Sequence, residues 1–233
     1  MAQEALASAK ADWLRRFDGA VAYKEVTFGA PTVRHLYKRS FDQLGRNCHF
    51  ITVFGRVLLG ERKIAEAEES VYKRIQEVQT AFERKVKALT AVVKQAGIED
   101  MAEFSKTEGV RAAVIVPAQG RFLRTLVLAD EYLRLVNTLW LEGEIPDSEK
   151  SKAELELKHL LRGIGSTTRK MRIYLQEKAN EAQERAKAEG VRLSAVEKAV
   201  AEATAGDAAA GSDDEDELVE ATEAEVEPEA VAA

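Results

Sequence analysis

The sequence predicts a mainly α-helical protein with minor β-structure, in which long helices pack antiparallel and an acidic segment follows the folded part. Three observations lead to this prediction. Of the 233 residues, 45% are hydrophobic and 32% charged, while 6% are aromatic and four are prolines, a composition that favours soluble helices. Apolar residues recur at steps of three, four and seven along one stretch of roughly 35 residues. Residues 199–233 contain 12 acids and no Lys or Arg.

The first third of the chain predicts one strand between helices. Residues 2–18 have a helical apolar side, and residues 22–28, "AYKEVTF", alternate in the manner of a strand. An apolar stripe from residue 31 to residue 44 then predicts a helix, with Gly45 at its C-terminal cap. Asn47 is a candidate N-cap for a second, buried helix.

The strongest helical pattern runs from residue 64 to residue 93, and a helix of that length needs a partner. Residues 147–190 supply one, with a candidate break at 163–168. Between the two helices, the β-branched residues 110–116 predict a second strand. The apolar residues 121–143 that follow predict a helix in the core.

Charge divides the chain into two predicted regions. Removing the 12 acids of residues 199–233 leaves 28 acids against 34 bases in residues 1–198. We therefore expect a helical domain over 1–198 with a net charge of +6 and a tail over 199–233 with a charge of −12. The Ala, Glu and Asp of the tail cannot bury enough apolar surface to offset the entropy of ordering, so the tail is expected to be disordered.

Catalytic and metal-binding patterns are absent from the sequence. It contains no phosphate-binding loop, dinucleotide fingerprint, HExxH or GxSxG motif, and the three histidines share no metal-ligand spacing. We expect neither enzymatic activity nor a cofactor. The lone Cys48 fits a reducing cytosol, and the chain starts without a signal-peptide pattern and lacks a membrane-length apolar run. The sequence therefore predicts a cytoplasmic protein that does not enter membranes.

Positive charge is the remaining functional signal. Residues 24–63 contain eight bases against three acids. On the helix that follows the first strand, Arg34, Lys38 and Arg39 lie off the apolar stripe and are candidates for contacts to DNA phosphates. An ordinary solvated helix face is the alternative interpretation.

A second basic run lies in the last long helix, where no acid occurs between Lys158 and Glu177. Its candidates for DNA contact are Arg169, Lys170 and Arg172.

The first strand could itself read DNA if it paired with the same strand of a second copy, because a two-stranded ribbon fits the major groove. Alternation points Tyr23, Glu25 and Thr27 away from the helices, and Thr27 suits a base contact. Lys24 falls on the apolar side, which weakens the pattern. Tyr23, Lys24 and Thr27 are the candidate residues on this strand.

The order of these segments resembles the AcaB-like proteins of integrating conjugative elements and large conjugative plasmids. The most specific part of the resemblance is "LVLADEYLRLVNTLWLEGEI", which is similar to an apolar-Ala-Asp-x-x-x-Leu-Val segment of that family. The resemblance implies a transcriptional regulator of conjugative transfer, with a DNA-binding region of ribbon-helix-helix type in a homodimer. The alternative is a structural or interaction protein of a mobile element, whose long helices dock other mobile-element proteins.

Overall fold

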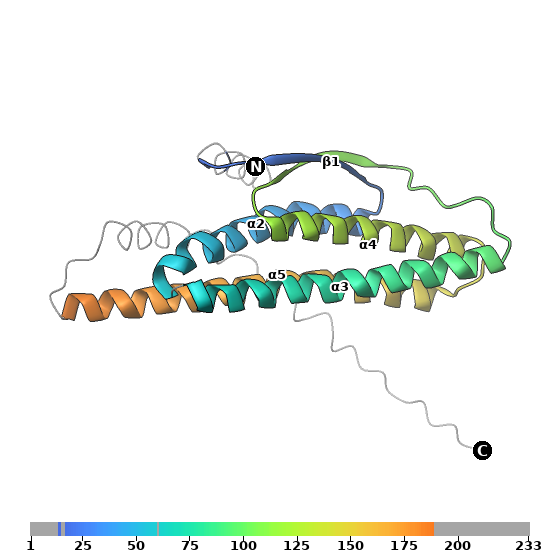
Figure 1. Cartoon of the computed structure of the whole chain (residues 1–233). Coiled ribbons are helices and arrows are strands. Elements are labelled where there is room, and N and C mark those ends of the chain that lie inside the picture. Colours follow the sequence, from blue (N-terminus) through green and yellow to red (C-terminus); the bar gives the residue numbers. More distant parts are fainter. Residues whose placement is uncertain (1–13, 15–16, 60, 189–233) are drawn as a thin grey trace, which may run out of the picture. The chain divides into compact units, whose positions relative to one another are not determined.

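The computed structural model describes residues 14, 17–59 and 61–188, and within them the predicted fold class is confirmed. Helices make up most of this part, and two strands form one small antiparallel sheet (Figure 1). In chain order the elements are β1 (Ala22–Phe28), α2 (Pro31–Leu59), α3 (Glu61–Gln95), β2 (Glu108–Val114), α4 (Pro117–Leu141) and α5 (Asp147–Ala188).

The two strands pair within one chain. β1 and β2 run antiparallel from Ala22 opposite Val114 to Phe28 opposite Glu108. The ribbon that we expected between two copies of β1 is thus formed by β1 and β2 of a single copy. β2 also ends two residues before the predicted limit, because the backbone N–H of Ile115 donates to Oε1 of Gln119 at 3.0 Å instead of joining a strand.

The predicted helix boundary at Gly45 and Asn47 is wrong, since α2 continues through both residues. Gly45 is buried against the side chain of Gln119 on α4, and a Cβ at this position would lie 2.5 Å from the Gln119 Nε2. The glycine allows two helices to approach closely and does not end one. Asn47 is only 2% exposed and bonds to other side chains as an interior residue of α2.

The predicted break at residues 163–168 is also wrong, because α5 is continuous there. Gly163 lies against the guanidinium of Arg74 of α3, so the glycine makes room for a long side chain from the other helix. The hydroxyls of Thr167 and Thr168 donate to the helix's own carbonyls, at Gly163 and Gly165. Hydroxyls bonded back in this way are compatible with an unbroken helix.

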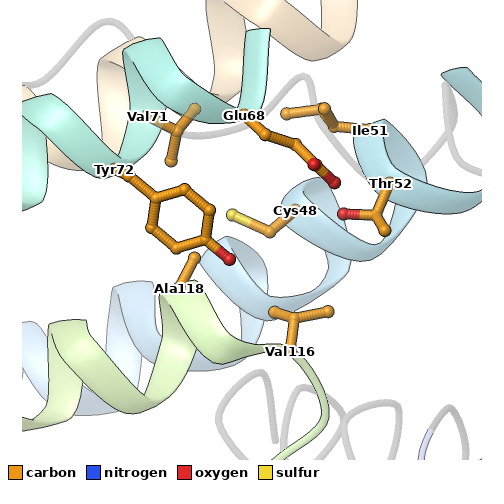
Figure 2. A pocket seen from close by; sticks show the side chains of 8 residues that line it. All are labelled: Cys48, Ile51, Thr52, Glu68, Val71, Tyr72, Val116 and Ala118. Atoms are coloured by element: carbon orange, nitrogen blue, oxygen red, sulfur yellow. The ribbon is translucent and has the colours of Figure 1, made fainter. Parts of the chain in front are cut away.

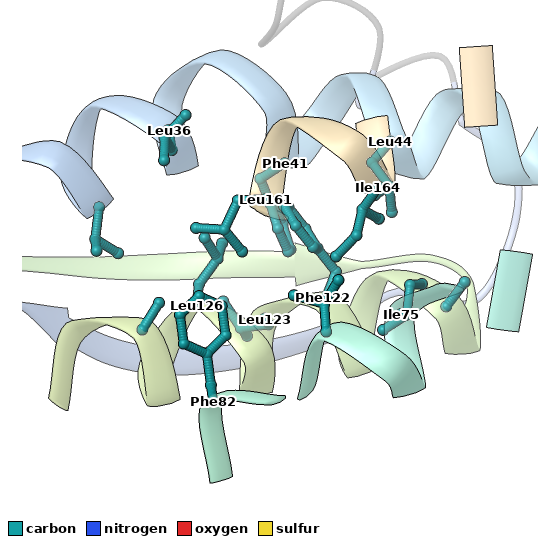
Figure 3. Close-up of a cluster of buried hydrophobic side chains, with 14 of the residues drawn as sticks. Leu36, Phe41, Leu44, Ile75, Phe82, Phe122, Leu123, Leu126, Leu161 and Ile164 are labelled. Carbon is teal, nitrogen blue, oxygen red and sulfur yellow. The ribbon is translucent and has the colours of Figure 1, made fainter. Parts of the chain in front are cut away.

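Side-chain contacts fix the helix directions. Lys85 of α3 bonds to Glu156 of α5 at 2.8 Å, and Arg74 of α3 lies against Gly163, so these two long helices run antiparallel as predicted. The ribbon covers α2 and α4, and α3 and α5 lie on their other side (Figure 1). One continuous core joins all four helices to the ribbon, as Figure 3 shows in part. Its largest fully buried side chains include Phe28, Phe41, Phe82 and Phe122.

The chain divides into two compact units, Met1–Glu177 and Lys178–Ala233. The first contains the ribbon, α2, α3, α4 and most of α5, and the second begins with the last turns of α5, where Lys178 pairs with Glu181 at 2.8 Å. The helix predicted over 2–18 lies almost wholly outside the described residues, and the predicted disordered tail lies entirely outside them. Within the described ranges, no helix combines the length and apolar character needed to cross a membrane.

Candidate nucleic-acid interface

The outer face of the ribbon carries an aromatic and a basic side chain in contact. Tyr23 on β1 is 52% exposed, and the guanidinium of Arg111 on β2 lies 4.2 Å from its ring centroid. Glu25 is directly opposite Arg111 in the register, and Thr27 is opposite Gly109. Tyr23, Glu25 and Thr27 are exposed, as alternation predicted. This face can therefore offer a flat aromatic ring, a guanidinium and a hydroxyl to a ligand.

Lys24 does not join that face. Its Nζ lies 3.8 Å from where a Cβ on Gly120 of α4 would be, which places the lysine on the helix-facing side of the ribbon. Phe28 lies four residues further along β1 on the same side of the ribbon. It is completely buried and contacts Tyr37 of α2. Lys24 is nevertheless exposed, although Ala112, directly opposite it in the register, is completely buried.

The turn between β1 and α2 is held by a carboxylate from α4. Asp130 accepts hydrogen bonds from the backbone N–H groups of Gly29 at 3.1 Å and Ala30 at 2.8 Å. These amides precede the first turn of α2, where helix N–H groups have no partners within the helix and a negative charge is favourable. Asp130 is the aspartate of the segment that resembles the AcaB-like proteins. That segment therefore holds the turn that joins the ribbon to α2.

The first group of predicted basic contacts, Arg34, Lys38 and Arg39, lies on α2, and two of its members are near the ribbon. Lys38 pairs with Glu108 at the start of β2, with 2.7 Å between Nζ and Oε2, so part of its charge is balanced. Arg34 is half-buried, and its Nε meets no hydrogen-bond acceptor within the described ranges. Arg39 is exposed. At about 100° per residue it lies further around α2 than Lys38, away from the ribbon.

The second group of predicted basic contacts, Arg169, Lys170 and Arg172, lies on α5. Arg172 is linked to α2 by hydrogen bonds through side-chain amides. Nη1 of Arg172 on α5 donates to Oδ1 of Asn47 at 3.2 Å, and Nε2 of Gln43 donates to the same oxygen at 3.1 Å. Oε1 of Gln43 in turn accepts from Nη2 of Arg46 at 2.6 Å. Two guanidiniums from different helices are thus oriented by neutral amides. Arg169 and Lys170 are exposed on the neighbouring turn of α5.

The hollow around Cys48 offers little room for a ligand (Figure 2). Cys48, Thr52, Glu68 and Tyr72 line it together with apolar side chains, and its volume of about 10 Å³ suits roughly one water molecule. Burial, with a smaller contribution from Glu68, raises the pKa of the Cys48 thiol to about 12. A protonated thiol is a poor nucleophile. Among the described residues, no three His, Cys, Asp or Glu side chains lie together in a way that could hold a metal ion.

Sequence reasoning did not single out two basic residues of the candidate interface, Arg111 and Arg46. Arg111 sits in a strand that looked apolar, although its alternation with Val110 and Ala112 could have placed it on the outer face. Arg46 was counted only as one of several bases. The hydrogen bonds that orient it depend on α5, so its sequence neighbours gave no signal.

No family model matches the chain, and no curated protein matches its sequence. A crystal structure of selenomethionine-containing AcaB from uropathogenic E. coli does match in three dimensions, with a TM-score of 0.66. The chain has the fold of AcaB. The match covers 72% of this chain and 86% of the AcaB chain, at 16% sequence identity. The resemblance inferred from sequence is therefore confirmed for the fold, and identity this low supports the fold alone.

Proposed function

We propose that this protein is a DNA-binding transcriptional regulator of conjugative-transfer genes on a mobile element. The observation that carries the proposal is the outer face of the β1–β2 ribbon, where Tyr23 and Arg111 are stacked and Thr27 is exposed. A two-stranded ribbon fits the major groove and presents alternate side chains to base edges. The AcaB fold and the resemblance of the sequence to AcaB-like regulators support the same role.

In this proposal, the ribbon reads bases and the start of α2 contacts the DNA backbone. Arg34 and Lys38 supply positive charge on the side of α2 near the ribbon, Arg39 supplies it further around the helix, and Asp130 holds the turn between the ribbon and α2. Phosphate contacts position a protein on DNA, whereas base contacts give specificity. Glu25 faces the same way as Thr27, so the ribbon must enter the groove with Glu25 near a base amine and away from phosphates.

The proposed active form is a homodimer. In this homodimer each copy presents its own β1–β2 ribbon, so that each ribbon stays two-stranded, as the major groove requires. Light scattering at several protein concentrations measures this assembly directly.

The test is fluorescence polarisation of the full chain with duplex DNA from its own locus, titrated with salt. Replacing Arg34, Lys38 and Arg39 with alanine should weaken binding to all sequences and lower the salt slope by about 0.9 for each phosphate that is no longer neutralised. Lys73, Lys87 and Lys94 on exposed positions of α3 provide a control with the same change in charge. Thr27→Val and Arg111→Gln should change the sequence preference more than the affinity. If the wild-type chain binds none of these duplexes, the proposal is wrong.

The burial of α3 argues against the alternative in which the long helices dock other mobile-element proteins. That alternative needs an apolar stripe left open for a partner, but Ile75, Val78 and Phe82 are at most 1% exposed within their own chain.

A further inference from the structure

We propose that Arg111 and Glu25 together read one G·C base pair at the centre of the β1–β2 ribbon. Arg111 donates to the guanine, and Glu25 accepts from the amino group of the cytosine paired with it. This assignment takes DNA as the ligand of the ribbon and therefore rests on the proposed function. It names the base pair that the ribbon selects and the two side chains that select it.

The register places these two residues at the middle of the ribbon. Seven residue pairs join β1 to β2, and Glu25–Arg111 is the fourth of them. The helices begin at equal distances on both sides, because α2 starts at Pro31 and α4 at Pro117, each three residues after its strand ends. The central pair therefore lies midway between the two points where the chain turns away into a helix.

The outer face of the ribbon carries one acid and one base, and both are in the central pair. The residues of this face, in opposite pairs, are Tyr23 and Ala113, Glu25 and Arg111, and Thr27 and Gly109. The charges of Glu25 and Arg111 cancel, so the face itself has little net attraction for phosphates. What it offers is a set of directional donors and acceptors, which suits base edges.

Small residues on β2 leave the central pair accessible. Gly109 is exposed and has no side chain, and a Cβ at this position would meet only the Thr27 hydroxyl within 4 Å, at 3.9 Å. Ala113, on the other side of Arg111, is also small. The edge of a base pair can therefore approach Arg111 and Glu25 without a clash with their neighbours on β2.

Tyr23 orients the guanidinium of Arg111. The guanidinium carbon lies 4.2 Å from the Tyr23 ring centroid, and within the described residues no ion pair joins Arg111 to Glu25, although the two are directly opposite. Stacking covers one face of the planar guanidinium and leaves the N–H groups in its plane for a ligand. The Glu25 carboxylate likewise forms no ion pair in the described part of the chain.

These groups match the major-groove edge of a G·C pair. Guanine presents two neighbouring acceptors, N7 and O6, which one guanidinium contacts with two N–H groups. The paired cytosine presents its N4 amino group, which a carboxylate accepts. Opposite residues of an antiparallel pair have Cβ atoms about 5 Å apart, so both side chains can reach one base pair. An A·T pair has an amino group beside its N7 and therefore lacks the two acceptors that Arg111 needs.

The reading is directional because the two central residues differ. A ribbon made from two copies of one strand has the same residue on both sides of its centre. Here a reversed C·G pair would place the cytosine amino group against Arg111 and the guanine acceptors against Glu25. Both contacts would then be unfavourable, so each ribbon should accept the pair in one orientation only.

A selection from a randomised duplex library tests this reading without knowledge of the operator. The full chain is compared with Arg111→Gln, with Glu25→Ala and with Arg84→Gln, which removes an exposed guanidinium from α3, on the far side of α2 and α4 from the ribbon. The bound duplexes should share one fixed G·C pair for the wild type and Arg84→Gln. That position should become degenerate for Arg111→Gln, while the rest of the motif persists. Thermal melts check that each variant is folded.

Glu25→Ala should change binding in a different way from Arg111→Gln. It removes the only negative charge of the outer face, so affinity for all duplexes should rise. The preference for G·C over the other pairs at the fixed position should fall at the same time, because the cytosine amino group has lost its acceptor.

Modified bases at the fixed position then test single atoms. Replacing the guanine with 7-deazaguanine removes N7 and should weaken wild-type binding roughly 5-fold, with no further effect on Arg111→Gln. Inosine keeps N7 and O6 and is the matched control, which should bind like guanine. Tyr23→Leu should lose part of the preference for guanine, and Tyr23→Phe should restore it, because a phenyl ring still stacks on the guanidinium.

The outcomes separate this proposal from the proposed function. If the wild type binds duplexes but Arg111→Gln fixes the same pair, or if 7-deazaguanine binds as well as guanine, the G·C assignment is overturned and the regulatory role stands. If the wild type binds no duplex at all, the proposed function is wrong and the G·C assignment falls with it.

Discussion

Burial makes the Cys48 thiol chemically inert. Its pKa is raised to about 12, so almost none of it is thiolate near pH 8. We expect the native protein to react with a thiol reagent such as DTNB at a rate set by unfolding, and the urea-unfolded chain to react at once. Fast reaction of the native chain would show that the hollow between α2 and α3 opens readily.

The same shift makes stability depend on pH. A raised pKa means that the folded state holds its proton longer than the unfolded state, so stability falls as the pH rises from about 9 towards 12. Cys48→Ala removes this contribution. Urea midpoints of the two proteins should therefore differ most near pH 7 and converge as the pH approaches 10. A constant difference would contradict the burial of the thiol.

Asp130 is expected to stabilise the protein through its bonds to the amides of Gly29 and Ala30. Asp130→Ala leaves both amides without this acceptor and should lower the free energy of unfolding by about 1–3 kcal/mol. Asp130→Asn retains one acceptor oxygen, so its free energy of unfolding should lie between those of the wild type and Asp130→Ala. Asp100→Ala, at an exposed position, is the control. A decrease no larger than that of the control would show that water replaces Asp130 at the start of α2.

Two glycines within helices should respond in opposite ways to alanine. A Cβ at Gly45 would lie 2.5 Å from the Gln119 amide, whereas a Cβ at Gly165 would meet no atom within 4 Å. Gly45→Ala should destabilise the protein despite the better helix propensity of alanine. Gly165→Ala should stabilise it by up to about 1 kcal/mol. Thermal melts of both variants measure the contrast, and equal shifts would contradict the close packing of α2 against α4.

These glycines also show why the fold could be predicted only in part. The stripe of α3 and the alternation of β1 are local patterns, and both elements were predicted with nearly their observed limits. A glycine has the same local signature at a helix end and where a side chain of another helix lies against it, so the sequence around Gly45 and Gly163 could not separate the two. The partner that decides each case, Gln119 or Arg74, is more than 70 residues away.

The candidate site was harder to predict, for a related reason. Basic side chains on an exposed helix face are recognisable, and Arg34, Lys38 and Arg39 were identified in that way. Which bases adjoin each other depends on packing, and only the Arg172–Asn47 bond shows that α5 brings its cations to α2. The pairing of β1 with β2 likewise depends on residues 80 to 92 positions apart, which no local pattern encodes.

Packing of α3 against α4 should dominate stability among the helices. Phe82 is completely buried, and its ring lies 5.7 Å from that of Tyr132 on α4. Phe82→Ala should cost about 3–5 kcal/mol in urea denaturation. Val92→Ala on the same helix, where the side chain is 43% exposed, should change stability by less than about 0.5 kcal/mol. A similar loss of unfolding free energy in both variants would mean that burial of its apolar stripe does not stabilise α3.

For the whole chain, the opposite charges of residues 1–198 and 199–233 predict an effect on DNA binding. A tethered segment with 12 acids has a high effective concentration near the bases and competes with phosphates for them. Truncation after Lys198 should tighten non-specific DNA binding, most at low salt, where screening is weak. Measuring both chains at two salt concentrations tests this. Equal affinities at low salt would leave the segment as a passive solubiliser.

The pairing of β1 with β2 also has a consequence for how the chain assembles during synthesis. β1 leaves the ribosome early, but its partner strand begins at Glu108, and the carboxylate that holds the turn after β1 belongs to Asp130. α2 and α3 can form from local contacts in the meantime, whereas the ribbon must await the closure of a long loop. We therefore expect the surface proposed to read DNA to be absent from every nascent chain shorter than about 130 residues.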